Sequence, residues 1–390
     1  MQPAPNHLGI VESDPSRHDF KVVSVETSIV DVPTRRRHKL SQTSVTAQNY
    51  VIVRLRLAGG AEGIGEAATL GGPRWSEESV EAIKANIDAY LAPAVMGLQA
   101  NRFEALGKRM DEAAKRNNAA KAAVETALVD AVGRALDLPA AALLGGQVRD
   151  RIPVLWTLAS GDPGQEIEEA ETKLAARLHR IFKVKLGAQS PEADMERMTA
   201  LARALGDRAE LIVDANQAWD ETVAARCLAV LGELGVKLVE QPVPAWNIAA
   251  MARLRGIGGA PPLLADESVF DAHDMLAVAQ AGAADAVSLK LVKHAGLFGT
   301  RKVAAVAEAA GIGLYGGCLL ESSVGAAAHL QVFSTFRELA WGCEHFGPQI
   351  LTEDLVHAPL RFADFHVELP TGPGIGVTLD EAQLRRFARP

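Results

Sequence analysis

Residues 182–292 contain five short apolar runs that each end in polar residues: FKVKLG (182–187), LIVDAN (211–216), KLVEQP (237–242), PLLADES (262–268) and AVSLKLV (286–292). Runs of this length are typical of buried strands in a parallel sheet. The segments between them have the length and the 3.6-residue periodicity of crossover helices. This part of the sequence therefore predicts a repeating strand–helix architecture.

Three further strand candidates lie on either side of this stretch: IPVLWTL (152–158), GIGLYGG (311–317) and LAWGCEH (339–345). Eight strand–helix units over roughly 200 residues predict a closed parallel barrel, because a doubly wound sheet rarely contains so long a continuous alternation. No GxGxxG motif follows any of these strands, so a dinucleotide-binding fold is not indicated.

The sequence before the barrel has a different pattern. KVVSVETSIVDV (21–32) and NYVIVRLRL (49–57) alternate apolar and polar residues, and AEGIGEAAT (61–69) follows them, which predicts three antiparallel strands. Between residues 76 and 138 the period changes to that of amphipathic helices. We therefore expect an α+β domain ahead of the barrel.

The domain limits follow from these changes of pattern. We expect a flexible tail at residues 1–20, the α+β domain at 21–150 and the barrel at 151–348. The Pro- and Gly-rich segment PTGPGIGVTL interrupts the strand–helix rhythm, so residues 349–390 are predicted to return to the first domain.

The composition excludes several classes of protein. With 48% hydrophobic and 23% charged residues, the 390-residue chain is neither disordered nor collagen-like. A net charge of −8 with scattered basic residues argues against a nucleic-acid partner. The sequence shows neither an uninterrupted apolar span nor a signal segment, so we expect no membrane partner. Three distant cysteines, Cys227, Cys318 and Cys343, suit a reducing compartment, so we expect a cytoplasmic protein.

Charged residues stand at the carboxyl ends of the predicted strands. They are Lys183, Lys185, Asp214, Glu240, Asp266 and Lys290. This end of a parallel barrel is its catalytic face. The intervals from Asp214 to Glu240 and from Glu240 to Asp266 are both 26 residues, so each carboxylate belongs to the next strand. We therefore expect the charged side chains to lie next to one another.

The three carboxylates indicate a metal site. Like charges at short range raise each other's pKa, so Asp214, Glu240 and Asp266 need a compensating cation to stay ionised together. An all-oxygen set of three donors suits Mg²⁺ or Mn²⁺ and leaves coordination positions for water or substrate. Zinc, which favours histidine and cysteine, is not indicated.

The lysines indicate acid–base chemistry. Lys183 and Lys185 are two residues apart on one strand and face the same side, whereas Lys290 comes from a strand farther round the barrel. A lysine near a metal ion and other ammonium groups has a lowered pKa and can act as a general acid or base. Together with a metal, these lysines suit chemistry at the carbon α to a carboxylate, through an enolate.

Each of these residues has a structural explanation when it is taken alone. Asp214 or Asp266 could cap a helix, Glu240 could lie in a solvated turn, and a lysine at a strand end is usually just exposed. The combination of residue type, position and order favours the functional interpretation. Glu321 could simply lie in the first turn of a helix. We interpret His38, His294 and His329 as ordinary polar or packing residues.

The motifs resemble those of the muconate lactonizing branch of the enolase superfamily. They are KxK at 183–185, DxN at 214–216, EQP at 240–242, ADES at 265–268, LK ending at Lys290, and YGGxxLE ending at Glu321. Similar segments outside the barrel core include HKL (38–40), EGIGEA (62–67), WTLASGD (156–162), FGP (346–348) and LTED (351–354). The resemblance implies an enolase-type (β/α)7β modified TIM barrel, with an α+β capping domain that the C-terminal segment completes.

The resemblance also implies roles for individual residues. Asp214, Glu240 and Asp266 would bind Mn²⁺ or Mg²⁺, and Lys185 would be the acid–base group. Lys183 and Lys290 would act mainly through their charge, and Glu321 would hydrogen-bond at the substrate or the barrel mouth. The substrate-binding set would comprise Leu70, Gly71, Gly72, Asn216 and Phe346.

The implied reaction is the reversible cyclisation of cis,cis-muconate to muconolactone in aromatic degradation, in a homo-oligomeric enzyme that acts on a small dicarboxylate. PRW at 73–75, Ala295, Cys318 and Ser322 depart from the branch's pattern and leave the substrate open. Alternatives are chloromuconate or substituted-muconate cyclisation with syn or anti addition, dipeptide epimerisation, N-acylamino acid racemisation and o-succinylbenzoate synthesis. A non-catalytic metal-stabilised binding protein is the alternative outside enzymes.

Overall fold

The computed structural model describes residues 19–39, 44–74 and 77–389. Most of the predicted N-terminal tail, Leu40 of the HKL motif and Trp75 of the PRW segment lie outside the described residues. In the part that is described, no helix combines the length and the apolar character needed to span a membrane.

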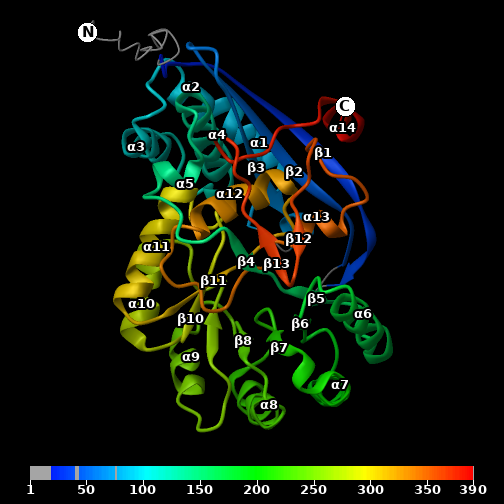
Figure 1. Cartoon of the computed structure of the whole chain (residues 1–390). Coiled ribbons are helices and arrows are strands. Elements are labelled where there is room, and N and C mark those ends of the chain that lie inside the picture. Colours follow the sequence, from blue (N-terminus) through cyan, green and yellow to red (C-terminus); the bar gives the residue numbers. More distant parts are fainter. Residues whose placement is uncertain (1–18, 40–43, 75–76, 390) are drawn as a thin grey trace, which may run out of the picture.

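The first domain is built on a three-stranded antiparallel sheet in the order β1-β2-β3 (Figure 1). The strands are β1 (Val22–Lys39), β2 (Ser44–Leu57) and β3 (Glu62–Thr69). The predicted alternation places Val51, Val53 and Leu55 in a buried cluster shared with the helices of this domain. The helical segments are η2 (Gly72–Arg74), α1 (Val80–Asn86), η3 (Ile87–Leu91), α2 (Ala92–Val95), α3 (Phe103–Ala113), α4 (Asn118–Leu136) and α5 (Ala140–Leu143).

Helix α4 lies directly against strand β3 because both surfaces carry small residues. A Cβ atom on Gly63 would lie 2.1 Å from the Ala127 carbonyl oxygen, and one on Gly65 would lie 2.0 Å from that of Ala123. Fifteen residues of α4 are buried, many of them alanines. The close approach therefore depends on the two glycines of the predicted strand.

The second domain is a parallel barrel. Its sheet runs in the order β5 to β11: β5 (Trp156–Leu158), β6 (Ile181–Lys185), β7 (Glu210–Asp214), β8 (Leu238–Glu240), β9 (Leu263–Ala265), β10 (Ala286–Leu289) and β11 (Gly313–Gly316). The helical segments that follow the strands are α6 (Pro163–Ala175), α7 (Pro191–Leu205), η4 (Gly206–Arg208), α8 (Glu221–Glu233), α9 (Ile248–Arg255), α10 (Ala272–Ala281), α11 (Leu297–Ala309) and α12 (Ser323–Phe333). Several begin at a capping side chain; Asp220, for example, accepts from the Val223 N–H.

Two predicted strands differ in the structure. The run at 152–158 divides into β4 (Arg151–Pro153) and β5, and β4 pairs instead with β13 (His366–Glu368), which also pairs with β12 (Phe362–Ala363). The run at 339–345 forms no regular strand, because Gly342 has a φ of 65° that interrupts the extended backbone. Cys343 alone bridges Val154 on one side and Gly316 on the other.

These bridges close the barrel. The Cys343 N–H donates to the Pro153 carbonyl at 2.9 Å, and the Glu344 N–H donates to the Gly316 carbonyl at 2.8 Å. The eighth position of the ring is thus filled by isolated bridges at Cys343 and not by a regular strand. The predicted fold class, a modified TIM barrel with an α+β capping domain, is confirmed.

The end of the chain returns to the first sheet. After α13 (Gly347–Ile350), Leu351 bridges Thr34 of β1, and after α14 (Glu381–Phe387), Ala388 bridges Val30. Arg389 then donates to both carboxylate oxygens of Asp31, at 2.5 and 2.9 Å. These contacts agree with a C-terminal segment that completes the capping domain, whereas the limits at residues 150 and 348 stay a prediction.

Candidate active site

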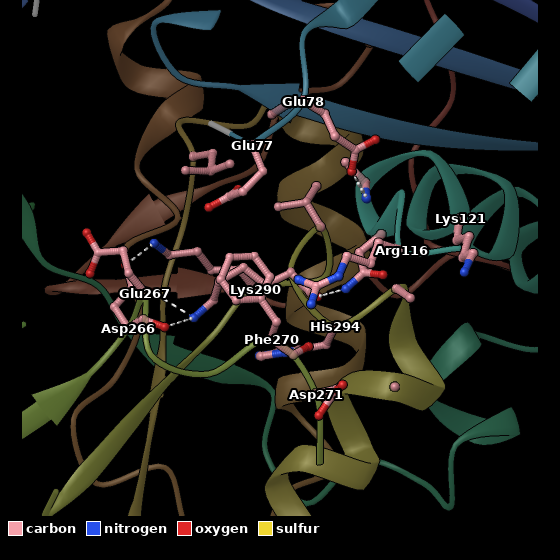
Figure 2. A pocket seen from close by; sticks show the side chains of 18 of the residues that line it. Glu77, Glu78, Arg116, Lys121, Asp266, Glu267, Phe270, Asp271, Lys290 and His294 are labelled. Atoms are coloured by element: carbon pink, nitrogen blue, oxygen red, sulfur yellow. Dashed lines mark hydrogen bonds and ion pairs between the residues drawn. The ribbon is translucent and has the colours of Figure 1, made fainter. Parts of the chain in front are cut away.

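A cavity of about 990 Å³ lies between the carboxyl ends of the barrel strands and the capping domain. The barrel contributes charged side chains from β6 to β10 and from the turn after β10. The capping domain contributes residues 68–70, Glu77, Glu78 and the region from α3 to the start of α4 (Figure 2). The predicted site therefore forms one wall of a pocket between the two domains.

Strand register brings the predicted residues together. Lys185 pairs directly with Asp214 across β6 and β7, and Asp214 pairs with Glu240 across β7 and β8. Glu240 in turn pairs with Leu264, two residues before Asp266. The three carboxylate residues are 1 to 3% exposed. Backbone pairing therefore fixes the spacing that the sequence predicts.

Each carboxylate has a lysine beside it. The Lys185 ammonium donates to Asp214 Oδ2 at 2.5 Å and to Asn216 Oδ1 at 3.1 Å. Lys183 contacts Glu240 and lies 4.0 Å from Asp214 Oδ2. Figure 2 shows Lys290 beside Asp266, with its ammonium 2.6 Å from Oδ2. All three predicted lysines thus face the carboxylate group.

The sequence interpretation missed two members of this network. Lys293, in the turn after β10, donates to Asp266 Oδ1 at 2.6 Å and to the Asp266 and Ser288 carbonyls. Glu344 contacts Lys183 and the Tyr315 hydroxyl. Glu344 follows the strand position at Cys343, so the rule that found the other carboxylates could have found it as well. Lys293 has no such signal, because it lies in an irregular turn.

The carboxylates differ in how readily they ionise. Burial and the neighbouring Asp214 raise the pKa of Glu240 to about 7. Burial also acts to raise the pKa of Asp266, but Lys290 and Lys293 hold it well below its usual value. Burial, Asp266 and Asp214 raise the pKa of Glu267, which lines the pocket, to about 8. The lysines therefore stabilise the ionised form of Asp266 more than that of Glu240 or Glu267.

Lys185 and Lys290 are protonated in this network, whereas burial lowers the pKa of Lys293. Burial opposes the charged form of Lys185, but Asp214 and Glu240 outweigh it and raise its pKa. Burial likewise opposes the charge of Lys290, and Asp266 and Glu240 raise its pKa. The lowered lysine pKa expected from the sequence refers to a site that also holds a divalent cation, and it stays a prediction.

The donor set fits a hard divalent cation. Asp214, Glu240 and Asp266 offer only carboxylate oxygens, come from three consecutive strands and are almost fully buried. Ionised carboxylates buried this close together need positive charge, and the lysine contacts show that the protein already places such charge there.

The predicted substrate residues have different positions. Leu70 and Asn216 line the pocket, and Asn216 donates to Glu267 Oε1 at 3.3 Å. Gly71 and Gly72 adopt positive φ and are not among the lining residues. Phe346 is buried against Trp156, with ring centroids 4.9 Å apart. A role for each in substrate binding stays a prediction.

Glu321 lies outside the pocket wall and is 2% exposed. Its ligand atoms and those of His329 and His345 lie within 4.8 Å of one another. Both ring nitrogens of His329 are occupied, since Nε2 accepts from the Leu291 N–H at 3.0 Å and Nδ1 donates to the Gly325 carbonyl at 2.7 Å. His329 therefore has no free nitrogen lone pair, whereas neither ring nitrogen of His345 makes a hydrogen bond to a described residue, so at most one imidazole of this group could act as a metal ligand.

Two of the histidines that the sequence analysis interprets as polar or packing residues lie near the site. His38 is buried, and burial together with Arg36 and Lys185 lowers its pKa well below the usual value. Burial and Lys293 lower the pKa of His294, which lines the pocket, to about 3. Both rings are therefore neutral near neutral pH, which agrees with packing or polar roles.

Comparison with known proteins agrees with this arrangement. Residues 24–145 match the model of the mandelate racemase / muconate lactonizing enzyme N-terminal domain, and residues 165–383 match the enolase C-terminal domain-like model. The chain belongs to the mandelate racemase / muconate lactonizing enzyme family. Members of the enolase superfamily to which this family belongs bind a divalent metal ion.

Relatives within the family match along nearly their whole length. Muconate cycloisomerase 1 of Pseudomonas putida is 47% identical over 94% of this chain and 98% of its own. A chloromuconate cycloisomerase of Delftia acidovorans is also 47% identical, over 95% of this chain and 100% of its own. The structure of the Pseudomonas fluorescens muconate lactonizing enzyme complexed with muconolactone aligns with a TM-score of 0.93 and 45% identity, over 95% of this chain and 100% of that one.

Proposed function

We propose that the protein is a muconate cycloisomerase, which interconverts cis,cis-muconate and muconolactone in the degradation of aromatic compounds. The observation that carries the proposal is the barrel wall, where three buried carboxylates come from consecutive strands and Lys185 contacts the first of them, Asp214, at the surface of the pocket. The near-full-length family relatives named for this reaction support it.

Asp214, Glu240 and Asp266 would hold the divalent cation, Mn²⁺ or Mg²⁺. When bound, this ion supplies positive charge opposite the oxygen that becomes negative as the substrate carboxylate acquires enolate character. The carboxylates would then exchange their lysine contacts for the cation, which leaves the lysine ammonium groups free to face the substrate.

Lys185 would give the proton that ends the reaction. One carboxylate of muconate adds across the distal double bond, and the carbon α to the other carboxylate then takes a proton from the Lys185 ammonium. Lys185 suits this role because it lines the pocket, whereas Lys183 is 1% exposed and saturated by Glu240 and Glu344. Lys183 would therefore act as a fixed positive charge.

The charge balance of the wall favours a dianionic substrate. Four lysines, Lys183, Lys185, Lys290 and Lys293, face the four carboxylates of Asp214, Glu240, Asp266 and Glu344. A divalent cation and a dicarboxylate also cancel each other, so the barrel wall stays neutral when both are bound. A monocarboxylate would leave a net positive charge beside this wall.

A chloromuconate is the second candidate substrate, since a chloromuconate cycloisomerase matches this chain equally well. The lysine network also bears on the racemase and epimerase alternatives. Those reactions need a lysine on each face of the substrate, and Lys290, which is held by Asp266, follows β10, four strands round the ring from Lys185 on β6. A cycloisomerase needs only one of these two lysines as proton donor.

We further propose that the protein is located in the cytoplasm and forms a homo-oligomer.

The test is to mix the purified protein with Mn²⁺ and cis,cis-muconate, to follow the loss of the conjugated-diene absorbance and to identify the product by NMR. Formation of muconolactone supports the proposal. If muconate is inert while a chloromuconate or a dipeptide reacts, the proposed substrate is wrong and the corresponding alternative replaces it.

A further inference from the structure

The cations that line the pocket differ in whether they have partners. They are Arg116, Lys121, Lys185, Lys290, Lys293 and Lys302. Beyond the three lysines of the barrel wall, Lys121 contacts Asp111 at 2.7 Å and Lys302 contacts Glu104 at 2.9 Å. Arg116 alone makes no side-chain hydrogen bond or ion pair with any residue in the described ranges. Arg116 is exposed and is therefore a hydrated cation without an ion-pair partner in a pocket that would receive an anion.

The backbone at Arg116 is strained and firmly held. Arg116 and Asn117 have φ values of 53° and 52°, a left-handed conformation that side chains other than glycine rarely adopt. The Asn117 amide accepts from Asn86 Nδ2 and donates to the Lys115 carbonyl, both at 2.8 Å. Such strain persists only where the surroundings enforce it, and it is common at ligand-binding positions.

The same turn is attached to the barrel. Asn118, the first residue of α4, donates from Nδ2 to the Lys293 carbonyl at 2.5 Å. Figure 2 shows Arg116 and Glu267 on different sides of the pocket. The position of Arg116 relative to the carboxylate wall is thus set by contacts on the capping domain and on the barrel.

We infer that Arg116 binds the substrate carboxylate that is remote from the metal ligands, and so selects dicarboxylates over monocarboxylates. A guanidinium offers two parallel N–H donors that match the two oxygens of a carboxylate. The barrel wall takes one end of the substrate, and Arg116 faces the pocket from the capping domain with its donors unused. If the substrate is muconate, this role of Arg116 identifies the group that binds its second carboxylate, and to that extent the inference rests on the proposed function.

The experiment compares two six-carbon probes that differ by one carboxylate. Adipate and hexanoate are titrated calorimetrically into the Mn²⁺-loaded protein, and the ratio of their dissociation constants measures the contribution of the second carboxylate. A charge-assisted bidentate contact is expected to favour adipate by roughly 10- to 100-fold. Arg116→Gln is expected to reduce this preference to within about threefold, and Arg116→Lys to retain part of it.

The matched control is Arg102→Gln. Arg102 is an exposed arginine of the same domain, at the start of α3, and it does not line the pocket. This variant is expected to keep the wild-type ratio. Unchanged hexanoate binding and an unchanged melting temperature in Arg116→Gln show that the fold is intact. If hexanoate binds too weakly to measure, the adipate dissociation constant of Arg116→Gln is compared with that of Arg102→Gln in place of the adipate-to-hexanoate ratio.

The inference is overturned if the wild type shows no preference for adipate, or if Arg116→Gln keeps the preference. The binding readout also separates this inference from the proposed reaction. A protein that leaves muconate unconverted, but loses its adipate preference in Arg116→Gln, would lack the proposed activity and still contain the carboxylate subsite.

Discussion

The barrel wall and the capping wall of the pocket differ in whether their cationic side chains have ion-pair partners. On the barrel wall, Lys185, Lys290 and Lys293 each contact a carboxylate that lies beside them. On the capping wall, Arg116 faces the pocket without a partner among the described residues. The barrel wall is thus prepared to hold a cation and to move a proton, whereas the capping wall keeps a group free for the substrate. Variants of each wall should therefore fail in different ways.

The largest effect is expected from Lys185→Ala. Loss of a positioned general acid typically lowers the rate about 10²- to 10⁴-fold, so kcat should fall by this amount. Mn²⁺ binding should persist, because the three carboxylates are untouched. Steady-state kinetics and a metal titration measure both quantities, with the exposed Lys108→Ala as control. Substantial turnover in Lys185→Ala would assign the proton to another group.

The next largest effect is expected from Asp266→Asn. This change removes one anionic ligand and leaves Lys290 and Lys293 with less negative charge beside them, so both should repel the cation more strongly. We expect Mn²⁺ affinity to fall by at least the roughly 10- to 100-fold that is typical of altered metal surroundings. Titration followed by electron paramagnetic resonance measures the affinity. The exposed Asp207→Asn is the control, and equal affinities would exclude Asp266 as a ligand.

The capping domain can be tested by the packing of α4 on β3. Gly65→Ala would place a methyl group 2.0 Å from the Ala123 carbonyl oxygen, and such overpacking destabilises a protein by about 1–3 kcal/mol. Gly107→Ala, in α3, meets no atom within 4 Å and should be neutral or stabilise by up to about 1 kcal/mol. Urea unfolding measures both changes. A stable Gly65→Ala variant would contradict the tight contact.

The last effect concerns the pH dependence of stability at the junction of the two domains. Glu66 of β3 accepts from the Ser322 N–H at 3.0 Å, and burial raises its pKa to about 8. The folded state therefore binds a proton that the unfolded state has released between pH 4.5 and 8, so stability falls as pH rises through this window. Relative to Glu66→Gln, the wild type should lose stability across this window, by up to roughly 5 kcal/mol for a shift of this size. Thermal unfolding at several pH values tests the sign, and parallel curves would contradict it.

The two walls also differ in how far the sequence predicts them. Strand-end carboxylates such as Asp214, Glu240 and Asp266 could be predicted, because strand periodicity and the order of strands in a barrel determine where such residues lie. Lys293 and Arg116 could not be, since irregular turns position them through side-chain contacts that no periodicity reveals. For the same reason the sequence did not show the break between β4 and β5, or the glycine turn that shortens the eighth strand to Cys343.

The measurement that tests the central claim most directly is turnover of cis,cis-muconate by the Mn²⁺-loaded protein in D₂O, with the product analysed by NMR. A single proton donor on the β6 side of the pocket predicts muconolactone with one deuterium at the carbon α to the free carboxylate, on one face only. Deuterium on both faces would show that a second group besides Lys185 delivers protons, and product without deuterium at that carbon would contradict the enolate route.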